Sequence, residues 1–305
     1  MSRQGWVLFV LVGVIWGVPF LLIKIADGGV SVAFLVFTRV FIGSLLLLPI
    51  AMRRGRLRAL LRCWQWLVAL SVVEVIVPWL LLSAAERRLS SSLSGLLVAV
   101  VPVIGVGVAR LAGDRDRLTA TRWAGLAIGL GGVTLLMRPA VAGGGVVPVL
   151  EALGTAVCYA IGPVIAARKL ADADALSVTA ASLGLASVVY VVPAALTWPQ
   201  AVPAPRVLAA LGALAAICTA VAFLLYLRLI AEAGPVRAEV VTYINPAVAV
   251  ALGVIVLGEP LSPLMMISFG LILAGSVLAT RSSNRPAPAA VPVEETLPAS
   301  GMTEG

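Results

Sequence analysis

The stretch Glu259-Pro260-Leu261-Ser262, between the last two long apolar runs of the chain, repeats Asp116-Arg117-Leu118-Thr119, which lies 143 positions earlier. Prolines recur at almost the same offset of 144 positions, namely Pro19 with Pro163 and Pro102 with Pro246. A shared order of apolar runs, turns and prolines indicates that the second half of the chain folds like the first. The sequence therefore predicts two related halves within one fold.

The composition sets the class of fold. Soluble domains are roughly half apolar and about a quarter charged, whereas this chain of 305 residues is 61% apolar and 12% charged. So few charged residues cannot cover a surface that faces water. The apolar runs do not alternate apolar and polar residues, as the strands of a membrane β-barrel do. We therefore expect an all-α polytopic membrane protein.

Ten apolar runs approach the length of about 20 residues that a helix needs to cross a bilayer. Five runs fall in each half, and an odd number of crossings would place the two halves in opposite orientations, as inverted five-helix repeats. The expected transmembrane helices are residues 6–26, 31–51, 65–82, 91–111, 121–138, 146–167, 175–196, 206–227, 236–257 and 263–280.

The basic residues predict the orientation. With a cytoplasmic N-terminus, sixteen lysines and arginines lie at the inner loops and helix ends and five at the outer ones, with Arg39 set aside as intramembrane. This excess follows the positive-inside rule. We therefore expect a multi-pass protein of the cell (inner) membrane with both termini in the cytoplasm. The net charge of +8 is then a signal of topology, and no nucleic-acid partner is expected.

The expected domain organisation follows from the repeat. Residues 1–138 form the first repeat, residues 139–145 a flexible linker, and residues 146–280 the second repeat. Residues 281–305 are rich in Ser, Pro, Ala and Glu and have little to bury, which predicts a disordered cytoplasmic tail.

Several kinds of chemistry find no support in the sequence. The chain has no histidine, and its three cysteines are scattered, so we expect no metal site and no disulfide framework. A phosphate-binding loop is missing, and the acidic residues form no catalytic pair. The sequence predicts no cofactor and no enzymatic activity. The expected partners are a small-molecule substrate, the lipid bilayer and protons, and the oligomeric state is left open.

Three short motifs resemble a known family. They are Ile15-Trp16-Gly17, Arg39 after Phe37-Thr38, and Asn245-Pro246 followed by 257–262 (Leu-Gly-Glu-Pro-Leu-Ser) and Leu273-Ala274-Gly275. Together they resemble the EamA-type ten-helix metabolite exporters of the drug/metabolite transporter superfamily, over residues 6–280. The first repeat departs from the pattern, with Arg115-Asp116 where Gly-Glu is typical. The resemblance implies a central cavity formed by the first four helices of each repeat, with the fifth and tenth as support.

Ionisable side chains within the bilayer are costly and are therefore candidates for function. Glu74 lies about nine residues into the third expected helix, roughly 13 Å deep at the rise of an α-helix. A carboxylate there suits proton coupling or contact with a substrate ammonium group, and the alternative is a structural ion pair with Arg39. Arg39 itself is a candidate to bind a substrate carboxylate, although pairing with Glu74 is favoured slightly.

Polar and aromatic residues at membrane depth complete the candidate substrate or coupling site. Trp16 and Tyr159 occupy nearly equivalent positions in the two repeats and are expected on opposite walls of one cavity, with packing alone as the alternative. Tyr243 and Asn245 lie at similar depth, and an amide there is expected to line the cavity rather than face lipid. Glu239, nearer the cytoplasmic end, is expected to reach the cavity.

These expectations combine into one functional hypothesis. The chain is expected to be a secondary active transporter that exports an amino acid or a similar small metabolite by alternating access, with proton coupling through Glu74. An uncoupled facilitator and a drug efflux protein are the alternatives. A membrane-embedded enzyme is disfavoured because the chain lacks a catalytic constellation.

Overall fold

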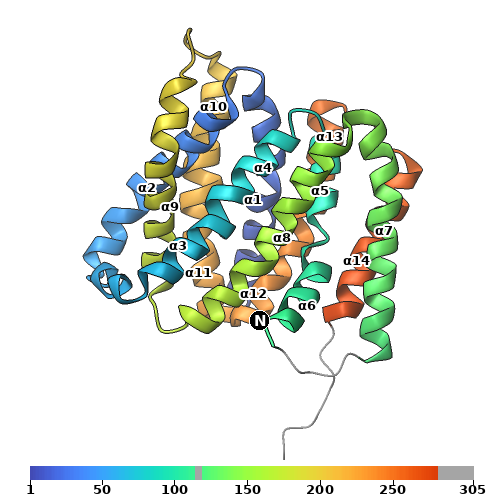
Figure 1. The fold of residues 1–305 in the computed structure, drawn as a ribbon, viewed down its shortest axis with the longest axis horizontal. Coiled ribbons are helices and arrows are strands. Elements are labelled where there is room, and N and C mark those ends of the chain that lie inside the picture. Colours follow the sequence, from blue (N-terminus) through green and yellow to red (C-terminus); the bar gives the residue numbers. More distant parts are fainter. Residues whose placement is uncertain (114–118, 281–305) are drawn as a thin grey trace, which may run out of the picture.

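The computed structural model describes residues 1–113 and 119–280, and within these ranges every regular element is helical (Figure 1). Ten helical stretches in the described residues are long and apolar enough to cross a membrane. The expected fold class, an all-α membrane protein with ten transmembrane helices, is confirmed. The expected tail, residues 281–305, and most of the turn at 116–119 lie outside the described residues.

The helices of each half follow one plan. The first half contains α1 (Arg3–Asp27), α2 (Val32–Arg53), a 3-10 segment (Leu57–Cys63), α3 (Trp64–Ser71), a π segment (Val72–Ile76), α4 (Val77–Ala85), α5 (Ser91–Val98), α6 (Val101–Leu111) and α7 (Ala120–Gly144). The second half contains α8 (Val146–Lys169), α9 (Ala175–Leu196), α10 (Pro205–Ala215), a π segment (Ala216–Val221), α11 (Ala222–Ala233), α12 (Pro235–Glu239), a 3-10 segment (Val240–Tyr243), α13 (Ile244–Leu257) and α14 (Pro263–Thr280).

The junction between the halves differs from the expected linker. Helix α7 continues to Gly144, so most of residues 139–145 is helical rather than a loop. The chain leaves the helix at Gly145, whose φ of 87° lies in the region that glycine tolerates and other residues avoid. The connection between α7 and α8 is therefore the single residue Gly145, instead of the seven residues 139–145.

The recurring prolines have two different effects. Pro19 and Pro163 lie inside α1 and α8, which continue through them. Pro102 and Pro246 lie in the first turns of α6 and α13. Backbone N–H groups have no intrahelical acceptor there, so the missing N–H of proline costs no helical hydrogen bond. The fourth transmembrane stretch of each half is accordingly divided just before this proline.

The two halves interlock instead of standing side by side. Helix α1 packs against α10, α11 and α13 of the second half, and α8 packs against α4, α5 and α6 of the first. Helices α2 and α9 pack together at one edge of the bundle (Figure 1). The first helix of each half is therefore held by the third and fourth transmembrane stretches of the other.

Helices α7 and α14 form a close pair at the opposite edge (Figure 1). The pair depends on glycine, because a Cβ atom added at Gly275 would overlap the backbone of Gly129. Without a side chain at either position the two backbones come into contact, as small residues permit in membrane helices. Gly275 therefore serves helix packing, whereas Gly270 on the same helix faces open space.

This difference within one helix gives a matched pair of variants. We expect Gly275→Ala to lower the free energy of unfolding by about 1–3 kcal/mol, as overpacking of a tight interface does. Gly270→Ala adds the same methyl group where no atom lies within 4 Å, and it should leave stability unchanged or raise it slightly. Thermal melting of both variants in one detergent measures the difference. Equal melting temperatures would contradict the close backbone contact.

Candidate functional site

The third transmembrane stretch of each half contains a π-helical segment, at Val72–Ile76 and at Ala216–Val221. The two segments lie 144 positions apart, which is the offset of the sequence repeat. In both, a backbone N–H donates to the carbonyl five residues back, from Val77 to Val72 and from Ala222 to Ile217. Short π segments inside α-helices are rare and occur frequently at functional sites.

Different residues accompany the two π segments. In the first, Pro78 lacks the N–H that would donate to the carbonyl of Glu74 in a regular α-helix. In the second, the hydroxyl of Thr219 donates to the carbonyl of Leu214, five residues earlier, at 2.8 Å. Glu74 and Thr219 therefore both lie where the helix is locally widened.

Arg39, on α2, is buried and held by both halves of the chain. Its Nε donates to Thr219 Oγ1 at 3.1 Å, and its guanidinium carbon lies 3.6 Å from the centre of the Trp79 ring. The expected ion pair with Glu74 is wrong, because neither residue takes part in a salt bridge to any described residue. The cation is stabilised instead by the face of an indole and by a hydroxyl group.

Glu74 is partly buried in the first π segment and faces α8. A Cβ atom added at Gly162 would overlap the Glu74 carboxylate, so the missing side chain of Gly162 makes room for it. Within the described residues the carboxylate makes no hydrogen bond and no ion pair. An unpaired carboxylate at this depth is available to a proton or a cationic group.

Tyr159, one turn before Gly162 on α8, brings the two charged residues into one group. It interacts electrostatically with both Arg39 and Glu74, and it packs against the main apolar core. The structure thus brings together three of the seven residues that the sequence singled out. Helix α8 and the second π segment, both in the second half, thus contribute to a group whose charges come from the first.

Trp16 and Glu239 meet through a residue that the sequence analysis did not select. The ring of Trp16 lies 4.7 Å from that of Tyr226 on α11 and 5.8 Å from that of Phe223. The Tyr226 hydroxyl donates to Glu239 Oε2 at 2.8 Å. Glu239 and Tyr226 also interact electrostatically with Glu74, so this aromatic group adjoins the charged one.

Tyr243 and Asn245 make contacts that join helices. The Tyr243 hydroxyl lies 3.2 Å from Thr280 Oγ1, near the end of α14. With its amide oriented to satisfy its neighbours, Asn245 donates to the carbonyls of Gly13 at 3.0 Å and Val241 at 3.3 Å. These bonds connect α13 with α1 and with the turn before α13, which is a structural role for the amide.

A second polar cluster lies at the opposite end of the bundle, around the N-terminus of α5. The Glu259 carboxylate accepts hydrogen bonds from the backbone N–H groups of Ser91 and Ser92, at 2.7 and 2.9 Å, and from the Ser92 hydroxyl at 2.6 Å. It therefore caps the N-terminus of α5, where negative charge is favoured. Lys24 Nζ donates to the carbonyls of Glu86 and Leu89 in the turn before α5.

Glu86 is the residue that sequence reasoning missed most clearly. It directly follows α4 and is fully buried, and neither carboxylate oxygen has a hydrogen-bond partner among the described residues. Burial raises the pKa of Glu86 well above its usual range, and the nearby Lys24 lowers it only in part. Its position after the expected helix 65–82 gave no signal, because a Glu at the end of a helix is normally solvated.

The other residues missed had weak signals. Tyr226 lies one position before the end of the expected helix 206–227, where an aromatic reads as an interfacial anchor. Tyr190, on α9, donates from its hydroxyl to the carbonyl of Ile76 in the first π segment at 2.6 Å. The only signal in the sequence was a tyrosine at membrane depth, because a buried tyrosine hydroxyl usually has a hydrogen-bond partner.

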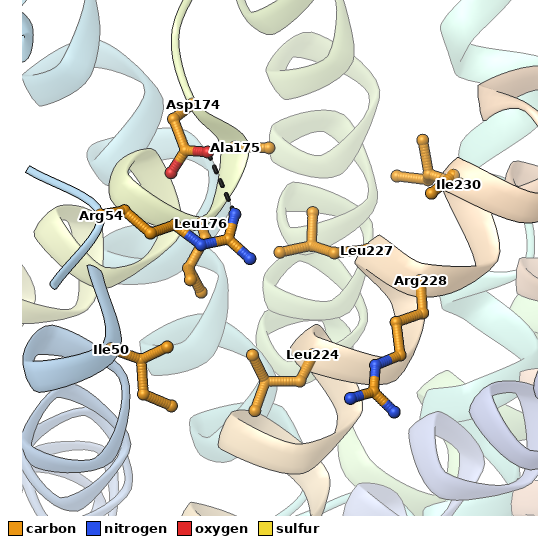
Figure 2. Close-up of a pocket in the computed structure, with 10 residues that line it drawn as sticks. Ile50, Arg54, Asp174, Ala175, Leu176, Leu224, Leu227, Arg228 and Ile230 are labelled. Carbon is orange, nitrogen blue, oxygen red and sulfur yellow. Dashed lines mark hydrogen bonds and ion pairs between the residues drawn. The ribbon is translucent and has the colours of Figure 1, made fainter. Parts of the chain in front are cut away.

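A separate pocket of about 570 Å³ opens at the ends of α2, α9 and α11 (Figure 2). Its walls are mainly Ile and Leu side chains, with Arg54, Asp174 and Arg228 as its charged residues. None of the seven residues selected from the sequence lines it. The pocket and the central group are therefore distinct features of the molecule.

Comparisons with known proteins agree on the kind of protein. The EamA-like transporter family matches residues 3–138 and 147–281, and each matched range contains five of the ten long apolar helices. The uncharacterized inner membrane transporter YedA of Escherichia coli (strain K12) is 28% identical over 272 residues, which are 88% of this chain and 87% of that protein. The uncharacterized transporter YvbV of Bacillus subtilis (strain 168) is 23% identical over 299 residues, 96% of this chain and 97% of that protein.

A solved structure supports the fold alone. A protein known by a crystal structure superposes with a TM-score of 0.65 at 21% sequence identity, over 92% of this chain and 98% of that one. The arrangement of the helices is therefore shared with a solved protein along nearly the whole chain.

The bond between Arg39 and Thr219 gives a stability test. Thr219→Val keeps the shape of the side chain but leaves the Arg39 Nε donor without its partner in a buried site. We expect a loss of about 1–3 kcal/mol in the free energy of unfolding. Thr179→Val is the matched control, because the Thr179 hydroxyl bonds only the Ala175 carbonyl of its own helix at 2.9 Å. If melting in detergent shows equal losses for both variants, Arg39 does not depend on Thr219.

Proposed function

Because this chain belongs to the EamA-like transporter family, we propose that it is a secondary active transporter that exports an amino acid or a similar small metabolite. Transport would occur by alternating access, with export driven by proton entry. The observation that carries this proposal is that two opposite charges, Arg39 and Glu74, both interact with Tyr159 and do not form an ion pair with each other. Charged side chains within a bilayer are costly, so each of the two is a candidate for function.

The charges suit a zwitterion. Arg39 uses its Nε and the face of its guanidinium within the protein, and its two terminal nitrogens make no hydrogen bond to a described residue. These nitrogens form the planar fork that binds carboxylates. Glu74 supplies the complementary carboxylate for an ammonium group. An α-amino acid carries both groups on one small molecule, and Tyr159 lies beside both partners.

The same carboxylate supports proton coupling. An unpaired Glu in the bilayer binds a proton more readily than in water, because burial disfavours its charged form. A proton and a substrate ammonium group would therefore compete for Glu74. Competition for one site couples inward movement of the proton to outward movement of the substrate. This coupling requires that the site reorients across the membrane only when one of the two occupies it.

One observation favours the alternative of drug efflux. Trp16, Phe223 and Tyr226 form an aromatic group next to Glu239, and aromatic faces with a carboxylate bind organic cations. An organic cation would need Glu74 or Glu239 but not Arg39. Substrates that move in an Arg39→Gln variant and not in a Glu74→Gln variant would support this alternative.

The proton-coupling prediction concerns Glu74→Gln. Proteoliposomes that contain the pH dye pyranine are exposed to a panel of amino acids and organic cations, and substrate-induced proton movement is recorded. We expect Glu74→Gln to reduce this signal by about tenfold or more, which corresponds to about 1.4 kcal/mol or more. Gly162→Ala should reduce it as well because the added methyl displaces Glu74, whereas Gly154→Ala meets only a terminal methyl of Leu81 and should not.

Several outcomes would contradict the proposal. Substrate flux without proton movement in the wild type would indicate an uncoupled facilitator. Unchanged proton movement in Glu74→Gln would remove Glu74 from the coupling step. Turnover of a lipid or peptide by the purified protein would favour a membrane-embedded enzyme over a transporter.

We also propose that the protein lies in the cell (inner) membrane with both termini in the cytoplasm. The excess of basic residues at one end supports this orientation. In a variant with its three cysteines replaced, Gln200→Cys should react with an impermeant thiol reagent added to intact cells, and Arg56→Cys should react only after lysis. Both positions are exposed in loops at opposite ends of the bundle. The reverse labelling pattern would overturn the orientation.

A further inference from the structure

We propose that the pocket between α2, α9 and α11 binds the headgroup of an anionic phospholipid from the adjacent leaflet. The pocket, of about 570 Å³, is lined by residues at the end of α2, at the start of α9 and on α11 (Figure 2). Arg54 comes from the end of α2, Asp174 from the start of α9, and Arg228 from α11. The charged side chains therefore come from three helices and meet at one end of the bundle.

Asp174 is already fully engaged within the protein. Its Oδ2 accepts hydrogen bonds from the N–H and hydroxyl of Ser177, at 2.9 and 2.8 Å, which caps α9. Its Oδ1 pairs with Arg54 Nη1 at 3.2 Å. Burial alone would raise the pKa of Asp174, but the Ser177 bonds and Arg54 outweigh it and lower the pKa below its usual value. The carboxylate therefore stays ionised and acts to position Arg54.

Arg54 and Arg228 keep donors for a ligand. Arg54 uses one of its five N–H groups in the pair with Asp174, and its side chain remains 54% exposed. Arg228 is exposed and makes no hydrogen bond or ion pair to any described residue. Two arginines with one engaged carboxylate leave a net positive charge at the pocket. That charge complements a phosphate group.

The remaining walls are apolar and suit an acyl chain. Ile50 on α2 and Leu224 and Leu227 on α11 face the pocket between the two arginines (Figure 2). An occupant that satisfies both kinds of wall has an anionic head and a hydrocarbon body. Basic pockets between transmembrane helices at the membrane surface bind anionic lipid headgroups in this way. A freely soluble anion would leave the apolar walls unused.

The position of the pocket also favours a lipid. Helix α2 ends at Arg53, and the segment that follows it carries Arg56 and Arg58, so the pocket lies at the strongly basic end of the bundle. In the proposed topology this end faces the cytoplasmic leaflet, which carries anionic lipids. Only the identification of this leaflet as cytoplasmic rests on the proposed function and topology. Lipid binding itself can be measured without any transport.

Native mass spectrometry of delipidated protein tests the inference. Phosphatidylglycerol or phosphatidylcholine is titrated into the wild type and into Arg228→Gln, Arg54→Gln/Arg228→Gln and Arg62→Gln. We expect one phosphatidylglycerol to bind the wild type preferentially, and the affinity to fall about tenfold in Arg228→Gln and further in the double variant. Arg62→Gln removes an exposed arginine outside the pocket and should retain the wild-type affinity. Arg228 makes no bond to a described residue, so its variant should fold normally.

A second variant tests the apolar wall separately. Ala231→Phe fills the pocket without changing its charge, and it should weaken phosphatidylglycerol binding as Arg228→Gln does. An equal loss in Arg62→Gln would indicate general attraction to the basic surface and would overturn a specific site. Equal binding of phosphatidylcholine, or displacement of the lipid by inorganic phosphate, would also overturn it. Displacement by an amino acid would make the pocket a substrate site instead.

Discussion

A backbone carbonyl that leaves its helical hydrogen bond inside a bilayer must find another donor, because no water is available there. This constraint governs the centre of the protein. In the first π segment, the carbonyl of Ile76 accepts a hydrogen bond from the hydroxyl of Tyr190, which belongs to the second half. In the second π segment the Thr219 hydroxyl donates to the carbonyl of Leu214, and it accepts a hydrogen bond from Arg39 of the first half. Each widened helix is thus supported by a side chain from the opposite half, so the interlocked packing of the halves and their central polar site arise together.

The sequence predicts the elements of this protein much better than their polar contacts. The ten transmembrane helices follow from hydropathy, because that signal is local. The expected helices 91–111 and 236–257 missed the division of the fourth stretches, which Pro102 and Pro246 accompany. The partners of Arg39 could not be predicted in this way. Proximity in span and depth favoured Glu74, but the guanidinium lies over Trp79, which the sequence analysis did not select. Which of several residues at one depth actually meet depends on helix rotation, and rotation is set by packing across the whole bundle.

The motif that best identifies the family has a structural role here. Glu259, in the Leu-Gly-Glu-Pro-Leu-Ser stretch, caps α5 of the other half with three hydrogen bonds. Lys24 binds the turn that precedes α5, and Arg87 pairs with Asp27 at 2.6 Å. At one end of the bundle, the elements are therefore joined by charged side chains from other elements. In an alternating-access cycle these hydrogen bonds and this ion pair would have to break. Hydrogen bonds to water would then offset part of the free energy that breaking them costs.

The two π segments also show how one backbone plan can carry different chemistry. Glu74 lies in the first, and Cys218 occupies the position 144 residues later in the second. A carboxylate in both copies would place two like charges within the bilayer interior, which is unfavourable unless one is protonated. A carboxylate in one copy only, with an arginine contributed by α2, supplies the acidic and the basic group that the proposed transport of a zwitterion uses. Repetition of the backbone supplies the widened helices, and the departure from repetition supplies the charge difference on which the proposed transport depends.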